Sequence, residues 1–215
     1  MKMKKLILFL VATFVAVVAN AQYEDEGIVD KRTNAVHVGI KVGANLSTMS
    51  RYELVDLGQK SSFGFEGGLV LSTRFGKRNR GSDPGTGVLG IQIEPSYVQH
   101  NVKTDYDNIK LSYFEVPILF KFFVTPNLNI EVGPNIAGTL SSKPDYVEAP
   151  NTKIATGDIK GMDVKVCVGV GYETKEGLFA SLRYNLGTSN LAGNFPCKVS
   201  AASLTIGYKF NIFKF

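Results

Sequence analysis

Tyr113-Phe-Glu-Val-Pro-Ile-Leu-Phe-Lys-Phe-Phe-Val124 is the stretch that decides the fold. Every second residue from Phe114 to Val124 is apolar, and these residues share one face. The other face has Glu115 and Lys121 among bulky side chains. Alternation over about twelve residues predicts a long β-strand. A strand in a soluble sheet would expose a polar face to water, but here neither face is polar. The pattern is typical of a membrane barrel, with the apolar face toward lipid and the mixed face toward the lumen.

The same alternation recurs in seven further segments, and no helical periodicity occurs between them. Together with 113–124, the expected strands cover residues 35–46, 61–74, 87–100, 128–141, 161–173, 178–188 and 200–212. Eight is an even number, as bacterial outer-membrane barrels have. We therefore expect an all-β fold, an eight-stranded antiparallel up-and-down transmembrane β-barrel over residues 35–215. A soluble, lipocalin-like barrel is the alternative fold.

The connections between these strands alternate in length. Residues 125–127 and 174–177 are expected to be tight turns. The long, polar connections are expected near residues 47–60, 101–110, 142–160 and 189–199. Short turns at the periplasmic end and long loops at the outer end are typical of outer-membrane barrels. The segment 142–160 is the longest loop, and for that reason it is the first candidate for an outside contact.

One connection departs from this alternation. Residues 74–86 should form a short turn but instead form a long basic segment, with Arg74, Lys77, Arg78 and Arg80. We interpret it as a solvated turn. The alternative is that it binds lipid phosphates or a periplasmic protein.

The N-terminus carries an export signal. Lysines precede an apolar run of about 13 residues, Leu6 to Val18, which Ala19-Asn-Ala21 follows. This run is shorter than the roughly 20 residues of a membrane-spanning helix, so residues 1–21 are predicted to be a cleaved signal peptide. Residues 22–34 are then a flexible periplasmic lead-in. Removal of three lysines lowers the basic count from 24 to 21 against 19 acidic residues, a balance that offers no argument for a nucleic-acid partner.

The expected lumen is filled with charge, because eight strands enclose a space that side chains can fill. The inward faces carry five acidic and five basic side chains, namely Lys41, Glu66, Glu94, Glu115, Lys121, Glu131, Asp163, Lys165, Arg183 and Lys209. An equal number of each sign is what an internally neutralised plug requires, since an unpaired buried charge costs several kcal/mol. We interpret the set as a structural charge network. A narrow path for protons or small ions is the alternative.

Catalytic and metal-binding chemistry has little support in the sequence. Some eight-stranded outer-membrane barrels modify lipid A, which requires a histidine beside a serine and a carboxylate. Of the two histidines, His37 is expected inside the barrel near its periplasmic end. His100 is expected at the outer end of the strand over 87–100, beside Ser96 and the loop acids Asp105 and Asp107, and we interpret it as a loop histidine rather than a catalytic one. Cys167 and Cys197 are expected to be free thiols rather than a disulfide. No spacing suits a metal ion, so we expect no catalytic residue, no metal and no cofactor.

The chain ends at Phe215, on the last alternating segment. A terminal aromatic residue of this kind resembles the signal that barrel-assembly machinery recognises in outer-membrane proteins. The expected partners are therefore this machinery and outer-membrane lipid.

Several short motifs resemble the PorT-like outer-membrane β-barrel family. Those motifs are Val38-Gly-Ile-Lys-Val-Gly-Ala-Asn-Leu46, Tyr113-Phe-Glu-Val-Pro-Ile-Leu-Phe-Lys121, Gly133-Pro134, Gly169-Val-Gly-Tyr172, Arg183-Tyr184 and Gly207-Tyr-Lys-Phe210. The match covers essentially the whole mature chain. The namesake of the family is linked to export through a secretion system of Gram-negative bacteria. The resemblance implies an integral outer-membrane barrel and leaves the biochemical role open.

The expected function is that of a non-enzymatic scaffold. The barrel would hold loops, or the basic turn, against a periplasmic or cell-surface protein and so assist secretion or envelope assembly. A lipid A-modifying enzyme and a narrow channel for small solutes are the two alternatives.

Overall fold

The structure, a computed structural model, describes most of the expected barrel domain. It covers residues 35–49, 60–75, 88–103, 105, 108–143, 146–149, 152–155, 161–188 and 198–214. The predicted signal peptide and lead-in, the segment 76–87, Cys197 and Phe215 lie outside the described residues.

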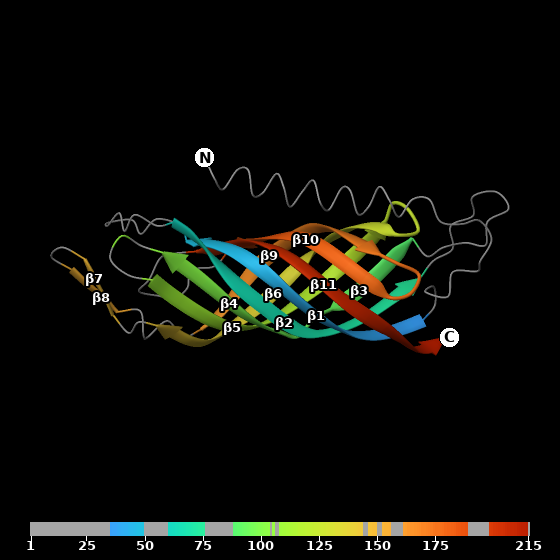
Figure 1. Cartoon of the computed structure of the whole chain (residues 1–215), viewed down its shortest axis with the longest axis horizontal. Helices are drawn as coiled ribbons and strands as arrows, with labels where there is room; N and C mark the ends of the chain where they lie inside the picture. The colour runs from blue at the N-terminus through green and yellow to red at the C-terminus, as the bar shows by residue number, and fades with distance from the viewer. Residues whose placement is uncertain are drawn as a thin grey trace.

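The described strands close into an antiparallel barrel (Figure 1). They are β1 (Ala35–Met49), β2 (Lys60–Phe75), β3 (Leu89–Ile93), β4 (Ser96–Lys103), β5 (Asn108–Phe123), β6 (Leu128–Lys143), β7 (Tyr146–Ala149), β8 (Thr152–Ala155), β9 (Met162–Glu173), β10 (Leu178–Gly187) and β11 (Val199–Lys214). β1 pairs with both β2 and β11, which removes the free edges of the sheet.

Two of these elements count as one strand of the barrel. β3 and β4 follow one another between β2 and β5 and pair with both. Glu94 and Pro95 separate them, because a proline has no N–H to donate to the ladder. The barrel therefore has eight strands, as predicted. Among the described residues no helix is long and apolar enough to cross a membrane.

The middle of the barrel shows apolar side chains to the outside. Large side chains such as Phe120, Val168 and Ile206 are 40–56% exposed on this surface. On β5, Phe114 and Phe122 face outward, whereas Glu115 and Lys121 are buried. The faces predicted from the alternation are therefore confirmed on this strand, and an exposed apolar band of this kind is what lipid covers.

The polarity of the two faces is inverted at one end of the barrel. Val102, Ile109 and Leu111 point inward there and are buried. On the outside, an exposed ion pair joins Lys60 to Asp105 with a distance of 2.7 Å between Nζ and Oδ1. Since water, not lipid, suits a charged outer face, this end is built like a soluble barrel.

This inversion corrects one of the expected loops. β4 continues to Lys103 and β5 begins at Asn108, so the long loop expected near 101–110 is wrong. The predicted strands were shorter than β4 and β5 because the inward side chains become apolar at this end, which reverses the expected alternation. Further along the chain, the expected loop 142–160 contains a hairpin of β7 and β8, which projects beyond the barrel (Figure 1).

The opposite end carries the short turns and the last residues of β11 (Figure 1). Residues 124–127 connect β5 to β6, and residues 174–177 connect β9 to β10. Gly177 has φ = 102°, a left-handed conformation that glycine adopts without the strain of a side chain. Both expected tight turns are confirmed, and they define this as the short-turn end.

Candidate functional site

One charged side chain from each of the eight barrel strands meets inside the lumen. We call this set the central charge network: Lys41, Glu66, Glu94, Lys121, Glu131, Glu173, Arg183 and Lys209. None of the eight is more than 8% exposed. Four are acidic and four are basic, so the network is neutral as a whole.

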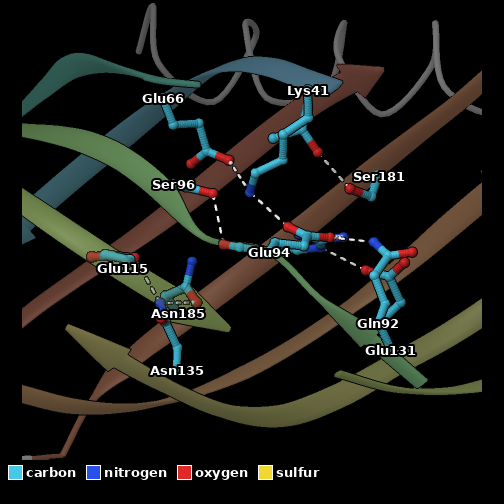
Figure 2. A network of polar contacts seen from close by, with 12 residues as sticks. Lys41, Glu66, Gln92, Glu94, Ser96, Glu115, Glu131, Asn135, Ser181 and Asn185 are labelled. Atoms are coloured by element: carbon cyan, nitrogen blue, oxygen red, sulfur yellow. Dashed lines mark hydrogen bonds and ion pairs between the residues drawn. The ribbon is translucent and has the colours of Figure 1, made fainter. Parts of the chain in front are cut away.

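Arg183 is the centre of this network. Its two terminal nitrogens donate to Glu94 over 2.5 and 2.7 Å, and its Nε donates to Glu131 over 2.5 Å. A guanidinium bound to a carboxylate through two parallel hydrogen bonds is a strong, geometrically specific pair. On the other side of Glu94, the Nζ of Lys41 lies 2.6 Å from Oε2 and 3.3 Å from Glu66 (Figure 2).

The network continues toward the short-turn end. Lys121 Nζ lies 2.9 Å from Glu131 and 2.6 Å from Glu173, and Lys209 Nζ lies 2.8 Å from the same Glu173 oxygen. Lys209 also donates to Gln92 over 2.7 Å, and Gln92 donates to Glu94. The contacts therefore form a closed circuit in which every cation touches a carboxylate.

Two glycines make room for the long charged side chains. A Cβ at Gly169 would lie 2.7 Å from Cγ of Arg183, and a Cβ at Gly171 would lie 2.6 Å from Oε1 of Glu131. Both distances are too short for any side chain. The absence of a side chain at these two positions therefore leaves space for Arg183 and Glu131.

The ten predicted lumen charges are all buried, but they fall into different groups. Seven belong to the central charge network, and Glu115 and Lys165 form a second cluster nearer the long-loop end. Asp163 is buried on β9 at that same end. Glu173 was missed, although it continues the inward positions of β9, because it stands last in its strand.

Arg74 does not belong to a solvated turn, as the sequence had suggested. It lies in β2 and is 3% exposed. Its guanidinium stacks 3.7 Å above the ring of Phe123 and donates to the carbonyl of Pro126 over 2.9 Å. The interpretation is wrong for Arg74, whereas Lys77, Arg78 and Arg80 lie outside the described residues.

His100 is also placed differently from the prediction. It lies on β4 with its side chain in the lumen, 1% exposed, and not in a loop. Nδ1 lies 2.7 Å from Ser47 Oγ, and Nε2 lies 3.0 Å from Glu115 Oε1 and 3.2 Å from Lys165 Nζ. We call Ser47, His100, Glu115 and Lys165 the His100 cluster.

The His100 cluster contains the residue types of a catalytic triad, but its serine is buried. Ser47 Oγ lies 2.7 Å from both His100 Nδ1 and Asn45 Oδ1, so the amide oxygen competes with the histidine for the one hydroxyl proton, which a nucleophilic serine donates to its histidine. Glu115 is bound by Lys165 over 2.5 Å and by Asn135 over 2.7 Å. Ser47 is fully buried, so a substrate has no route to its oxygen in this structure.

A small cavity separates the two clusters and touches Lys41, Glu66, Glu115 and Cys167. Its volume is about 10 Å³, close to the smallest space that holds one water molecule. Cys167 is a free, buried thiol at its edge. Within the described residues, no group of three or more His, Cys, Asp or Glu side chains is placed to hold a metal ion.

A closed eight-stranded barrel with an apolar outer band and a charged lumen defines the class of outer-membrane β-barrels. The sequence matches the family described as "Outer membrane protein beta-barrel domain" over residues 20–193. The chain belongs to this family, and its place is the outer membrane. No curated protein sequence matches the chain.

Solved structures with the same fold include surface proteins and an enzyme. Neisserial surface protein A is 14% identical with a TM-score of 0.54, over 80% of this chain and 97% of that chain. Ail, the attachment invasion locus protein of Yersinia pestis, is 15% identical with a TM-score of 0.48, over 82% and 99%. The outer membrane enzyme PagL is 14% identical with a TM-score of 0.42, over 78% and 98%. These likenesses concern the fold alone.

Proposed function

We propose that this protein is a non-enzymatic outer-membrane scaffold whose lumen is a structural plug. The central charge network carries this proposal, since it joins all eight strands across the space that a channel or an active site would need. The predicted lumen charges have a structural role in this proposal: they fix the strands relative to one another and close the barrel. The function then belongs to the ends of the barrel and to its partners.

The proposed partners are proteins of the envelope. The resemblance to the PorT-like family favours a role in export or envelope assembly. The hairpin of β7 and β8 supports a contact at the cell surface, because it extends paired strands beyond the barrel wall (Figure 1). Assembly into the membrane would depend on β11 and the terminal Phe215, recognised by the barrel-assembly machinery.

The test is photo-crosslinking in intact cells, with the crosslinking amino acid placed at Val147 in β7. The scaffold proposal expects one protein to be captured reproducibly. The matched control carries the same amino acid at Ile130, which lies in the exposed apolar band and should capture lipid instead of that protein. If no protein is captured from Val147 or from the corresponding position Ile154 in β8, the scaffold proposal for the hairpin is wrong.

A lipid-modifying hydrolase is the second candidate, and the contacts of His100 with Ser47 and Glu115 favour it. We predict that replacing Ser47 by Ala leaves the lipid A of the outer membrane unchanged, because Ser47 is fully buried and Asn45 competes with His100 for its hydroxyl proton. Mass spectrometry of lipid A, compared with a deletion strain, measures this. Lipid A that changes in both the Ser47→Ala strain and the deletion strain would establish the hydrolase in place of the scaffold.

A further inference from the structure

A cavity of about 350 Å³ opens at the short-turn end of the lumen. Its wall includes His37 of β1 and Arg74 of β2, and the turn 174–177 borders it. Lys121, Glu173 and Lys209, the last members of the central charge network, line it on the inner side. The volume lies in the range of sites that bind small molecules or short peptide segments.

Most of the charged side chains that line the cavity are basic. Arg74, Lys121, Lys175 and Lys209 are basic, and only Glu173 and Glu176 are acidic. The stacking on Phe123 and the hydrogen bond to Pro126 fix the direction of the Arg74 guanidinium. A guanidinium held in place in this way suits a carboxylate, which accepts two of its hydrogen bonds at once.

Two segments of the chain adjoin this cavity, and their charges differ in sign. Ala35, where β1 begins, is the strand neighbour of Arg74 in the cavity wall, and residues 22–34 directly precede it in the sequence. That segment carries Glu24, Asp25, Glu26 and Asp30 against Lys31 and Arg32. The segment 76–87, which joins β2 to β3 at the same end, is basic and does not complement the cavity.

The acidic segment also has the required reach. Glu26 lies nine positions before Ala35, and an extended chain of this length spans up to about 30 Å. Because the segment is tethered beside the cavity, its effective concentration there is in the millimolar range. The last strand offers no comparable occupant, since β11 stays paired with β1 as far as Lys214.

We propose that the cavity at the short-turn end binds the chain's own acidic segment around Glu24, Asp25 and Glu26. Carboxylates of the segment pair with Arg74 and Lys175, the two cations of the cavity wall that lie outside the neutral central charge network. The periplasmic mouth of the barrel is thereby occupied from within the same chain. A periplasmic protein that binds the segment would have to withdraw it from this cavity.

The test places a photo-crosslinking amino acid at Asp25 in the full chain, in intact cells. We expect an intramolecular product that mass spectrometry maps to the cavity residues, such as Lys175 or Asn211. The control carries the same amino acid at Gly81 in the basic segment and should give no product in the cavity. Products that link Asp25 only to another protein, or to no cavity residue, would overturn the proposal.

Two charge variants show whether the contact is electrostatic. Lys175 lies in an exposed turn, so the variant Lys175→Gln should fold normally while the yield of the intramolecular product falls severalfold. Arg74→Gln should reduce the yield further. Lys60→Gln, an exposed cation at the opposite end of the barrel, should leave it unchanged. Equal yields in all three variants would contradict a carboxylate site.

Discussion

Arg183 shows how a single residue connects the lumen. It binds Glu94 and Glu131, which come from strands on two different sides of the barrel, and both carboxylates are fully buried. Glu94 is also bound by Lys41, and Glu131 is also bound by Lys121. Removal of the guanidinium therefore leaves two buried carboxylates with one cation each.

We predict that Arg183→Met lowers the free energy of unfolding by about 3–5 kcal/mol, the usual effect of removing one partner from a buried ion pair. Urea unfolding of the protein folded in lipid vesicles measures this. In the control variant Lys60→Met the lost ion pair with Asp105 is exposed, and the change should stay within about 1 kcal/mol. A similar small change for Arg183→Met would show that the network does not stabilise the barrel.

The sequence predicted the inward direction of a side chain where the residue stands well inside an alternating segment. Lys41 and Arg183 stand in the middle of clear strands, and their inward direction follows from the period of two. Arg74 and His100 have the same alternation, but they were assigned to turns because they stand near strand ends. Their partners, Phe123 and Ser47, come from strands far away in sequence, and no local pattern contains that information.

At the scale of the strands, depth in the membrane determines which substitutions are tolerated. Ile206 and Ile212 are both exposed on the lipid-facing side of β11. Ile206 pairs with Val42 in the middle of β1, whereas Ile212 lies three residues before Phe215 at the short-turn end. The two positions form a matched pair, with the same residue type on the same strand at different depths.

Ile206→Arg should destabilise the folded barrel by about 2–4 kcal/mol, because the charge is placed near the centre of the bilayer. Ile212→Arg should cost about 0–1 kcal/mol, since headgroups and water are within reach of its side chain. Folding in vesicles, followed by the heat-modifiable mobility of the barrel, gives both values. Equal costs at the two positions would mean that β11 does not cross the apolar layer as described.

The strands themselves were predictable wherever lipid lies outside and charge inside. Across this part of the barrel the apolar face identified each strand and its direction. At the long-loop end the polar side chains lie outside, as Lys103 and Lys110 do, and Val102 and Ile109 lie inside. The expected pattern is reversed there, so β4 and β5 were predicted too short.

At the scale of the whole molecule, the filled lumen predicts the absence of conductance. The circuit of ion pairs crosses the barrel, and the cavity between the two clusters has a volume of only about 10 Å³. We expect no stepwise currents when the purified protein is inserted into planar bilayers, with an open porin as the positive control. Steady single-channel steps from the barrel would contradict the plug and favour the narrow channel.

The contribution of every strand to the central charge network has a consequence for biogenesis. The strands from β1 to β9 supply all four carboxylates but only two cations, Lys41 and Lys121. Arg183 and Lys209 come from β10 and β11, which are synthesised after β1 to β9. A partly assembled sheet would carry two excess negative charges into the bilayer, at a cost that lipid cannot offset. We therefore expect insertion and closure to occur as one event, without a stable half-inserted intermediate.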